Sequence, residues 1–502
     1  MAMLLAVQLF VAVYWVWLPP AGDEAIHIYN ATRVASGQFP YVDFFSYLTP
    51  LTYLLGGLMV RLTDAPVLTL RVAMSALSFC SFFIFYKFLK TQLKPQDELS
   101  HWLFLASYVA ATVLTSSYFS HHNIDNALFV AILLYAVSFT HHPKYVYGLG
   151  TLIGGASLVH QAHGFAYFIA TTIYIGVFSS PLVKERLLSI ARFLTPLVVI
   201  YAVFAFVLYR ADSLGQFIDG AILWNLDTYS KKLAFSPFED TLYDLRRNPG
   251  IEQYLFFATK TAIFLATAVL VVAIAKGDAR ASLRGNLLLV LLIILFVVSR
   301  TNTLANFSAY YIIVFAFLGL YVILPKGNWI PILLSMLLLV QMVRVFSFPV
   351  RYHATLFSGI ANLQPVGASQ FFPGADTNRL LSIAKTVQHL DLKDAIVIGR
   401  SPEIYFLFGI QNPSRYDVAI PLYLDERQVK EVITSMRNTT VIYDKTFDHL
   451  SKATDFFDFH HYRSGENLKP EIENSPLLQQ MRDMRRVHSD RYVNVLTQNS
   501  TR

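Results

Sequence analysis

Three carboxylates near the start of the chain are suited to acid–base chemistry. Asp23 and Glu24 directly follow the first apolar segment, and Asp125 ends a short polar stretch, Ser120-His-His-Asn-Ile-Asp125. A carboxylate at the boundary between membrane and water can take a proton from an acceptor hydroxyl while a lipid-held donor lies alongside. An acidic start to a helix over 24–35 explains the first pair equally well, because acidic residues are common in first turns.

Four histidines could bind a metal ion or form hydrogen bonds to a substrate. His121 and His122 precede Asp125, and His160 and His163 lie in the sequence Leu-Val-His-Gln-Ala-His-Gly. Histidines together with a carboxylate make a reasonable site for a divalent ion. No i,i+4 pair or other ligand spacing imposes such a site, however, and adjacent histidines rarely bind one ion together. A divalent metal ion is therefore left open, with His121, His122 and His163 as its candidate ligands.

Cations and aromatic residues in the polar loops could hold a phosphate or a sugar. Lys231, Lys232 and Arg300 could stabilise charge that develops on a phosphate leaving group, or they could bind lipid head groups. Tyr41 and Tyr47 could stack on a sugar or form hydrogen bonds to it. Tyrosine is also common at membrane interfaces without any ligand.

The segments between these loops are apolar enough to cross a membrane. The chain has 502 residues, of which 55% are hydrophobic and 15% are charged, whereas soluble domains have about 25% charged residues. The net charge of +7 does not indicate nucleic-acid binding, because the basic residues of the first two-thirds lie mostly in short loops. The predicted spans lie near residues 2–18, 67–86, 102–118, 125–140, 147–160, 164–180, 190–209, 255–275, 286–299, 309–324 and 328–347.

Loop charges predict the topology of these spans. Lys87, Lys184 and Arg280 mark three loops as cytoplasmic by the positive-inside rule. With the N-terminus also inside, Leu51–Leu62 cannot cross fully and should lie along the outer face as an amphipathic segment. This predicts a polytopic α-helical membrane protein of about eleven spans, or about twelve if that segment crosses. The candidate catalytic and binding residues then lie on the extracytoplasmic side.

The last third of the chain has the pattern of a water-soluble domain. Apolar runs stop at Phe348, so we predict a transmembrane module over 1–348 and an extracytoplasmic α/β domain over 349–502. Helical and strand patterns alternate in this domain at Asn378–Leu390, Ala395–Gly399, Asp425–Met436 and Thr440–Tyr443. A polar tail of uncertain order follows from Phe447.

The order of features in the first loop resembles the GT-C class of membrane glycosyltransferases. An apolar first helix leads to Asp23-Glu24, a short helix, the turn Gly37-Gln-Phe-Pro-Tyr41-Val-Asp43 and an apolar segment opened by Pro50. This order is similar to that of bacterial relatives of protein O-mannosyltransferases and of the aminoarabinose transferases of lipid A. The resemblance covers the membrane part through about Arg192 and the remainder only in general layout.

The resemblance implies an enzyme that moves a sugar, with inversion, from a polyprenyl-phosphate carrier to an extracytoplasmic acceptor. The acceptor is a glycan, lipid or protein, and the implied location is the bacterial inner membrane. Asp23, paired with Glu24, corresponds to the catalytic base, and Asp125 corresponds to a second acidic residue in the next outer loop. His160 stands where relatives often carry a lysine, so the cation that binds the carrier phosphate is left open. Asp43 belongs to the aromatic turn and is a further candidate for substrate binding.

Two other functions fit a protein with many spans. A transporter or flippase for lipid-linked sugars predicts inverted repeats and charges at mid-membrane, but the sequence shows no repeat. A polysaccharide polymerase or ligase needs no acidic pair directly after its first span. The transferase hypothesis predicts that Asp23, Asp125 and at least one of His160 or Arg300 line a single outward cavity.

Overall fold

The structure is a computed structural model of the chain, and its residues cluster into two compact units. Unit 1 includes the residues between Arg71 and Arg210, and unit 2 includes Val16–Leu70, Ala211–Ala234 and Pro349–Arg502. The described residues are 23–63, 65–92, 98–113, 121–139, 145–180, 182–226, 377–399, 402–419, 424–445, 475–490 and 492–498, with the single positions 6, 9, 261 and 314. Each unit is described by itself.

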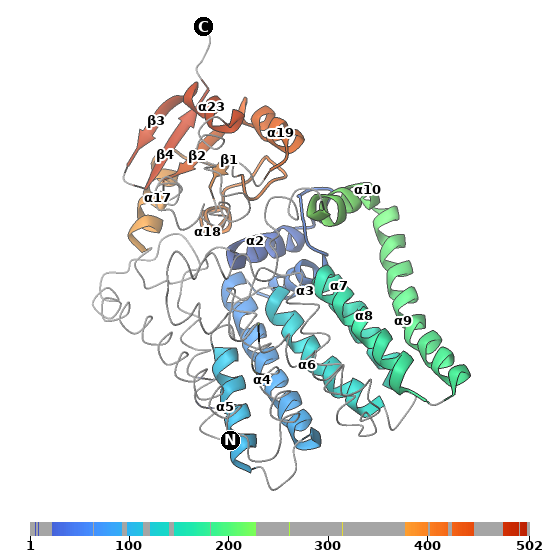
Figure 1. Cartoon of the computed structure of the whole chain (residues 1–502). Coiled ribbons are helices and arrows are strands. Elements are labelled where there is room, and N and C mark those ends of the chain that lie inside the picture. Colours follow the sequence, from blue (N-terminus) through green and yellow to red (C-terminus); the bar gives the residue numbers. More distant parts are fainter. Residues whose placement is uncertain are drawn as a thin grey trace. The chain divides into compact units, whose positions relative to one another are not determined.

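Unit 1 is helical wherever the structure describes it (Figure 1). Its helices are α4 (Pro66–Gln92, in this unit from Arg71), α5 (Glu98–Val113), α6 (His121–Phe139), α7 (Tyr145–Val159), α8 (Gln161–Phe178) and α9 (Val183–Arg210). They confirm helices at the predicted segments 67–86 through 190–209. The spans predicted beyond residue 254 and the boundary predicted at residue 348 fall outside the described residues, apart from two isolated positions.

Helices α4 and α9 are long and apolar enough to cross a membrane. A rise of about 1.5 Å per residue makes each roughly 40 Å long, which exceeds the hydrocarbon core of about 30 Å. Helix α9 leaves Val198, Val203 and Phe206 more than half exposed. Large exposed apolar side chains along one helix indicate a surface that faces lipid.

Helix α7 packs against α6, α8 and α9 within unit 1. Its glycines allow this close approach: a Cβ atom at Gly150 would lie 2.2 Å from the Phe193 carbonyl oxygen, and one at Gly154 would lie 2.7 Å from Ile200. Small residues at helix contacts are typical of membrane bundles, because they let two backbones come together.

The first loop of the chain forms two short helices in unit 2, α2 (Asp23–Ala35) and α3 (Leu51–Val60). Helix α2 confirms the predicted helix over 24–35. Helix α3 has ten residues, so its length of about 15 Å is too short to cross a bilayer. The two helices pack through Gly57, whose missing side chain leaves room for Val34.

The carboxy-terminal part of unit 2 contains a four-stranded mixed sheet with the order β1-β2-β4-β3. Its strands are β1 (Ala395–Ile398), β2 (Thr440–Asp444), β3 (Arg485–Ser489) and β4 (Val493–Thr497). The β1–β2 pair is parallel, and the β2–β4 and β3–β4 pairs are antiparallel. The helices of this part are α17 (Thr377–His389), α18 (Glu403–Phe408), α19 (Glu426–Met436) and α23 (Pro476–Arg482).

Helices cover both faces of this sheet, because alternate residues of a strand point to opposite faces. Ile396 and Ile398 of β1 pack in a core with residues of α19 and α23. Ala395 and Val397 pack in the opposite core with residues of α17 and α18. The predicted α/β domain is confirmed in its helices and in its first two strands. The expectation of a polar tail is wrong for α23, β3 and β4, which complete the sheet.

Helix α2 contributes to the core of this α/β domain. Tyr29 lies in the core with α17 and α18, and its ring stacks on Tyr405 at a centroid distance of 4.8 Å. The backbone N–H of Phe45 donates to the Arg415 carbonyl oxygen at 2.7 Å. The first loop and the carboxy-terminal domain therefore form one packed body, although more than 300 residues separate them in sequence.

Candidate functional site

Helix α2 begins with the acidic pair that was predicted to act in catalysis, Asp23 and Glu24. Asp23 is the first residue of α2, and the side chain of Glu24 is 2% exposed. The side chain of Asp23 lies outside the described parts of the structure. An acidic residue in the first turn of a helix interacts favourably with the helix dipole. The position therefore suits both the structural role and the role of a base proposed below.

The aromatic turn after α2 holds itself together through hydrogen bonds. Gly37 and Tyr41 have positive φ values of 95° and 71°. The Tyr41 hydroxyl donates to the Leu48 carbonyl oxygen at 2.6 Å, and its side chain is buried. The Asp43 carboxylate accepts from the Phe39 backbone N–H at 2.6 Å. These contacts hold the turn together, and substrate binding by Tyr41 and Asp43 stays a prediction.

Tyr47 lies beside η1, a π-helical segment over Ile218–Leu223. Its ring is 5.3 Å from that of Trp224, and its carbonyl oxygen accepts from the Asn225 side chain at 2.7 Å. Tyr47 remains partly exposed, so its ring can still reach a ligand.

Arg33, which sequence reasoning missed, joins α2 to the carboxy-terminal domain through a buried ion pair. Its Nη1 atom is 2.5 Å from Oδ1 of Asp417, and the two side chains are 7% and 4% exposed. Arg33 also donates to the Asp43 carbonyl oxygen at 2.6 Å and to the Gln38 side chain at 2.5 Å. Burial raises the pKa of the Asp417 carboxyl above its usual value, and Arg33 opposes that rise.

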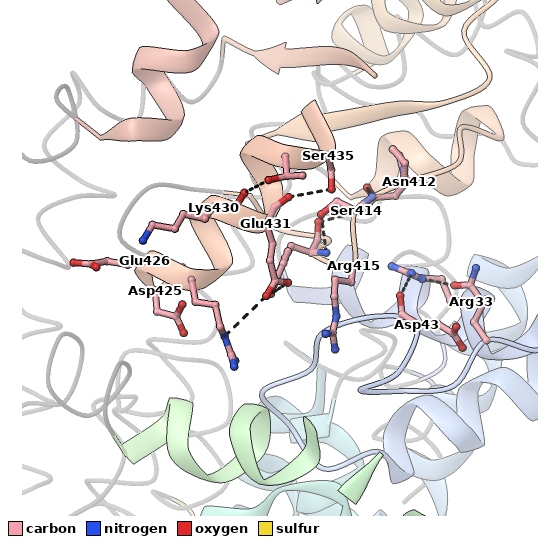
Figure 2. A pocket seen from close by; sticks show the side chains of 15 residues that line it. Arg33, Asp43, Asn412, Ser414, Arg415, Asp425, Glu426, Lys430, Glu431 and Ser435 are labelled. Carbon is pink, nitrogen blue, oxygen red and sulfur yellow. Dashed lines mark hydrogen bonds and ion pairs between the residues drawn. The ribbon is translucent and has the colours of Figure 1, made fainter. Parts of the chain in front are cut away.

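A cavity of about 1180 Å³ lies next to this ion pair within unit 2. Figure 2 shows Arg33 and Asp43 at its wall together with Arg415, Lys430 and Glu431. Side chains of both signs line it, so it can offer hydrogen bonds and charge to a polar ligand. No local sequence pattern indicates this cavity, because it forms only when segments near residues 33–43 and 412–435 come together.

In unit 1, Asp125 lies in a buried polar cluster on helices α6 and α8. Its Oδ2 atom is 2.6 Å from Nδ1 of His163 and accepts a hydrogen bond from the Tyr167 hydroxyl at 2.8 Å. Asp125, His163 and Tyr167 are each at most 5% exposed. Tyr167 was missed by sequence reasoning, although it lies four residues after His163 and therefore on the same face of α8.

His160 completes this cluster from the junction between α7 and α8. It is the N-cap residue of α8, with an extended backbone, and its ring centroid is 3.8 Å from that of His163. Gly164 lets the start of α8 approach α7, because a Cβ there would lie 2.3 Å from the Ser157 Cα. Asp125, His160 and His163 each place a ligand-type atom within 4.8 Å of the others.

Several other predicted site residues are not described. His121 and His122 begin α6, but their side chains lie outside the described parts, as do Lys231, Lys232 and Arg300 altogether. Asp23 belongs to unit 2 and Asp125 to unit 1, so the expectation of one shared cavity stays a prediction.

Comparison with known proteins identifies the class of fold. No family model and no curated protein matches the chain. Over its whole length the chain has a fold similar to that of a solved protein of the class that the first loop predicted.

One solved structure that it resembles is the crystal structure of ArnT from Cupriavidus metallidurans bound to undecaprenyl phosphate. The match covers 100% of this chain and 98% of ArnT, with a TM-score of 0.51 and 12% sequence identity. The likeness therefore concerns the fold, which extends through the carboxy-terminal domain.

Proposed function

We propose that this protein is a glycosyltransferase that moves a sugar from a polyprenyl-phosphate carrier to a hydroxyl group of an extracytoplasmic acceptor. The observation that carries this proposal is the full-length likeness to ArnT, whose crystal structure holds undecaprenyl phosphate. Of the acidic and histidine residues expected for such chemistry, Asp23 lies in α2, Asp125 lies in α6 and His160 lies between α7 and α8.

In the proposed reaction, the acceptor oxygen attacks the anomeric carbon from the face opposite to the carrier phosphate. The new bond forms as the bond to the phosphate oxygen breaks, so the configuration at that carbon inverts. Asp23 takes the proton of the acceptor hydroxyl, which makes that oxygen a better nucleophile. The electron pair of the broken bond remains on the carrier phosphate, where a nearby cation stabilises the charge. Lys231, Lys232 and Arg300 are the proposed cations.

Asp125 is proposed to orient the reacting groups instead of taking the proton. Its Oδ2 atom is held by both the Tyr167 hydroxyl and His163 Nδ1, at 2.8 and 2.6 Å. A side chain fixed in this way keeps its position while a substrate binds, which favours catalysis by orientation.

Transfer of labelled sugar by the purified protein tests the proposal. Detergent-solubilised protein is given a panel of undecaprenyl-phosphate sugars and an envelope lipid or glycan extract, and the Asp23→Asn variant is compared with wild type. We expect a loss of turnover of at least about a hundredfold, because general-base catalysis typically contributes this much. Asp212→Asn is the matched control, since Asp212 is exposed and asparagine tolerates its positive φ of 51°.

Two outcomes would contradict parts of this proposal. Full turnover by Asp23→Asn would show that another group is the base. Movement of labelled lipid-linked sugar across vesicle membranes, with no transfer to any acceptor in the extract, would favour a flippase instead.

A further inference from the structure

The cluster of Asp125, His160 and His163 has the composition of a metal site. It contains two imidazoles and one carboxylate, and its ligand-type atoms lie within 4.8 Å of one another. Among the residues that the structure describes, no other three side chains of the ligand types His, Cys, Asp and Glu come this close together. Two histidines and one carboxylate bind zinc in enzymes that keep a fourth position open, and they also suit iron, cobalt and nickel.

The local fold brings these three side chains together. His160 is the N-cap of α8 and His163 is three residues further, so the first turn of α8 directs both rings to the same side. Both rings face Asp125, which lies on α6. The Asp125 carboxylate is 2.6 Å from the His163 ring. The arrangement therefore depends on a tight connection between α7 and α8, in which a single residue separates the helices.

The cluster is buried, and a buried cluster of this kind is better suited to hold a metal ion than to be solvated by water. Asp125 is 2% and His163 is 5% exposed. Tyr167 donates to the Asp125 carboxylate, and hydrogen bonds of this kind orient the carboxylate ligands of metal sites. A buried carboxylate is stabilised by positive charge held close to it, and a divalent ion adds such charge.

We propose that Asp125, His160 and His163 bind one divalent transition-metal ion, with zinc as the best fit to this ligand set. Ligand atoms about 2.1 Å from a tetrahedral zinc ion are about 3.4 Å apart. The 2.6 Å contact between Asp125 and His163 would open to this distance as the ion replaces the proton shared there. The fourth position is left for water or another oxygen ligand.

Metal uptake by the full-length protein tests this site without donor or acceptor, so the result is independent of the proposed transferase activity. Protein without a polyhistidine tag is purified in detergent, stripped with EDTA and titrated with Co²⁺ while the visible d–d absorption is recorded. Zn²⁺ then displaces the Co²⁺, and elemental analysis gives the zinc content. We expect one ion per chain and a spectrum of four- or five-coordinate Co²⁺.

Variants then assign the ligands. His160→Ala and His163→Ala should each weaken zinc binding by more than about a hundredfold, while Tyr167→Phe, which keeps all three ligands, should weaken it by about tenfold. His101→Ala is the matched control, because His101 lies on α5 in the same unit and contacts Tyr86 instead of the cluster. Its zinc affinity should equal that of wild type.

The proposal is overturned if wild-type protein takes up less than half an equivalent of either ion. Asp125, His163 and Tyr167 would then form a hydrogen-bonded network without a metal. Zinc binding of wild-type strength by the His160→Ala and His163→Ala variants would likewise overturn it. X-ray absorption of the zinc-loaded wild type tests histidine ligation directly, even where a variant fails to fold. The proposed site requires scattering from histidine ligands, and a spectrum without it would reject the site.

Discussion

Removal of the Arg33 side chain should loosen helix α2 from the carboxy-terminal domain. Arg33 and Asp417 form an ion pair in which both side chains are less than 10% exposed. The Arg33→Met variant keeps the aliphatic part of the side chain but leaves the Asp417 carboxylate with a weak hydrogen bond from the Asn412 side chain, at 3.4 Å. The same substitution also removes the hydrogen bond to the Asp43 carbonyl oxygen.

The size of the effect follows from the burial of the pair. Breaking a buried ion pair by removing one partner typically costs about 3–5 kcal/mol, because an uncompensated buried charge remains. At about 1.4 kcal/mol for each factor of ten, α2 amides that exchange by local opening should exchange about a hundredfold to a few thousandfold faster. The double variant Arg33→Met with Asp417→Leu should recover much of this loss, since apolar side chains can replace such a pair.

The loss of stability in the Arg33→Met variant should also depend on pH. Burial raises the pKa of Asp417 in the folded protein, and removing Arg33 takes away a charge that lowers it. A group whose pKa is raised on folding binds a proton more tightly in the folded state, so its stabilising contribution is present at low pH and is lost as pH rises. The Arg33→Met variant should therefore be less destabilised at pH 5 than at pH 8.

Hydrogen–deuterium exchange of the intact protein in detergent measures this effect on peptides from α2. Arg61→Met is the matched control, because Arg61 is exposed and donates only to the carbonyl oxygens of Ala35 and Val34. Its effect should stay below about 1 kcal/mol. Equal exchange of α2 in wild type and Arg33→Met would refute the idea that this ion pair holds the helix. A larger loss at pH 5 than at pH 8 would refute the assignment to the Asp417 carboxylate.

Two further substitutions test the packing of each unit. Gly164→Ala should lower the thermal stability by about 1–3 kcal/mol, because its Cβ would lie 2.3 Å from the Ser157 Cα; Gly155→Ala, whose Cβ meets no atom within 4 Å, should be neutral or stabilising. An unchanged melting temperature for Gly164→Ala would show that α7 and α8 do not pack this closely. Asp425→Ala should cost about 1 kcal/mol by breaking the capping box with Gln428, whereas Asp425→Asn should keep most of the cap. Equal melting temperatures for these two variants would contradict that role.

The sequence predicted those elements whose local pattern is strong. The described helices of unit 1 follow apolar runs, and Asp425 followed by Gln428 three residues later is a capping signal that can be read without a structure. Strand β3 was missed because it is mostly exposed and its residues, such as Arg485, Arg486 and His488, show no apolar alternation. Strand β4 is recognised as buried only when it pairs between β2 and β3.

The sequence predicts which residues belong to the candidate site, but it does not predict which residues they contact. Asp125 and the two histidines were found from residue type, and the three-residue spacing of His160 and His163 is itself a usable signal that was underrated. Arg33 could not be paired with Asp417 from sequence, because the two are 384 residues apart and no local pattern links them. Such contacts are fixed by tertiary packing, which a reading of one sequence does not reveal.

The packing of unit 2 changes how the carboxy-terminal domain should be understood. Helix α2 begins at the proposed base, Asp23, and ends near Arg33, which is bound to Asp417. Tyr29, midway along the helix, stacks on Tyr405. A helix is stiff over 13 residues, so contacts along its length and at its end also fix the direction of its start. The proposed base is therefore positioned in part by residues of the last domain, and substitutions at Tyr405 or Asp417 should alter turnover although no proposed reacting group is removed.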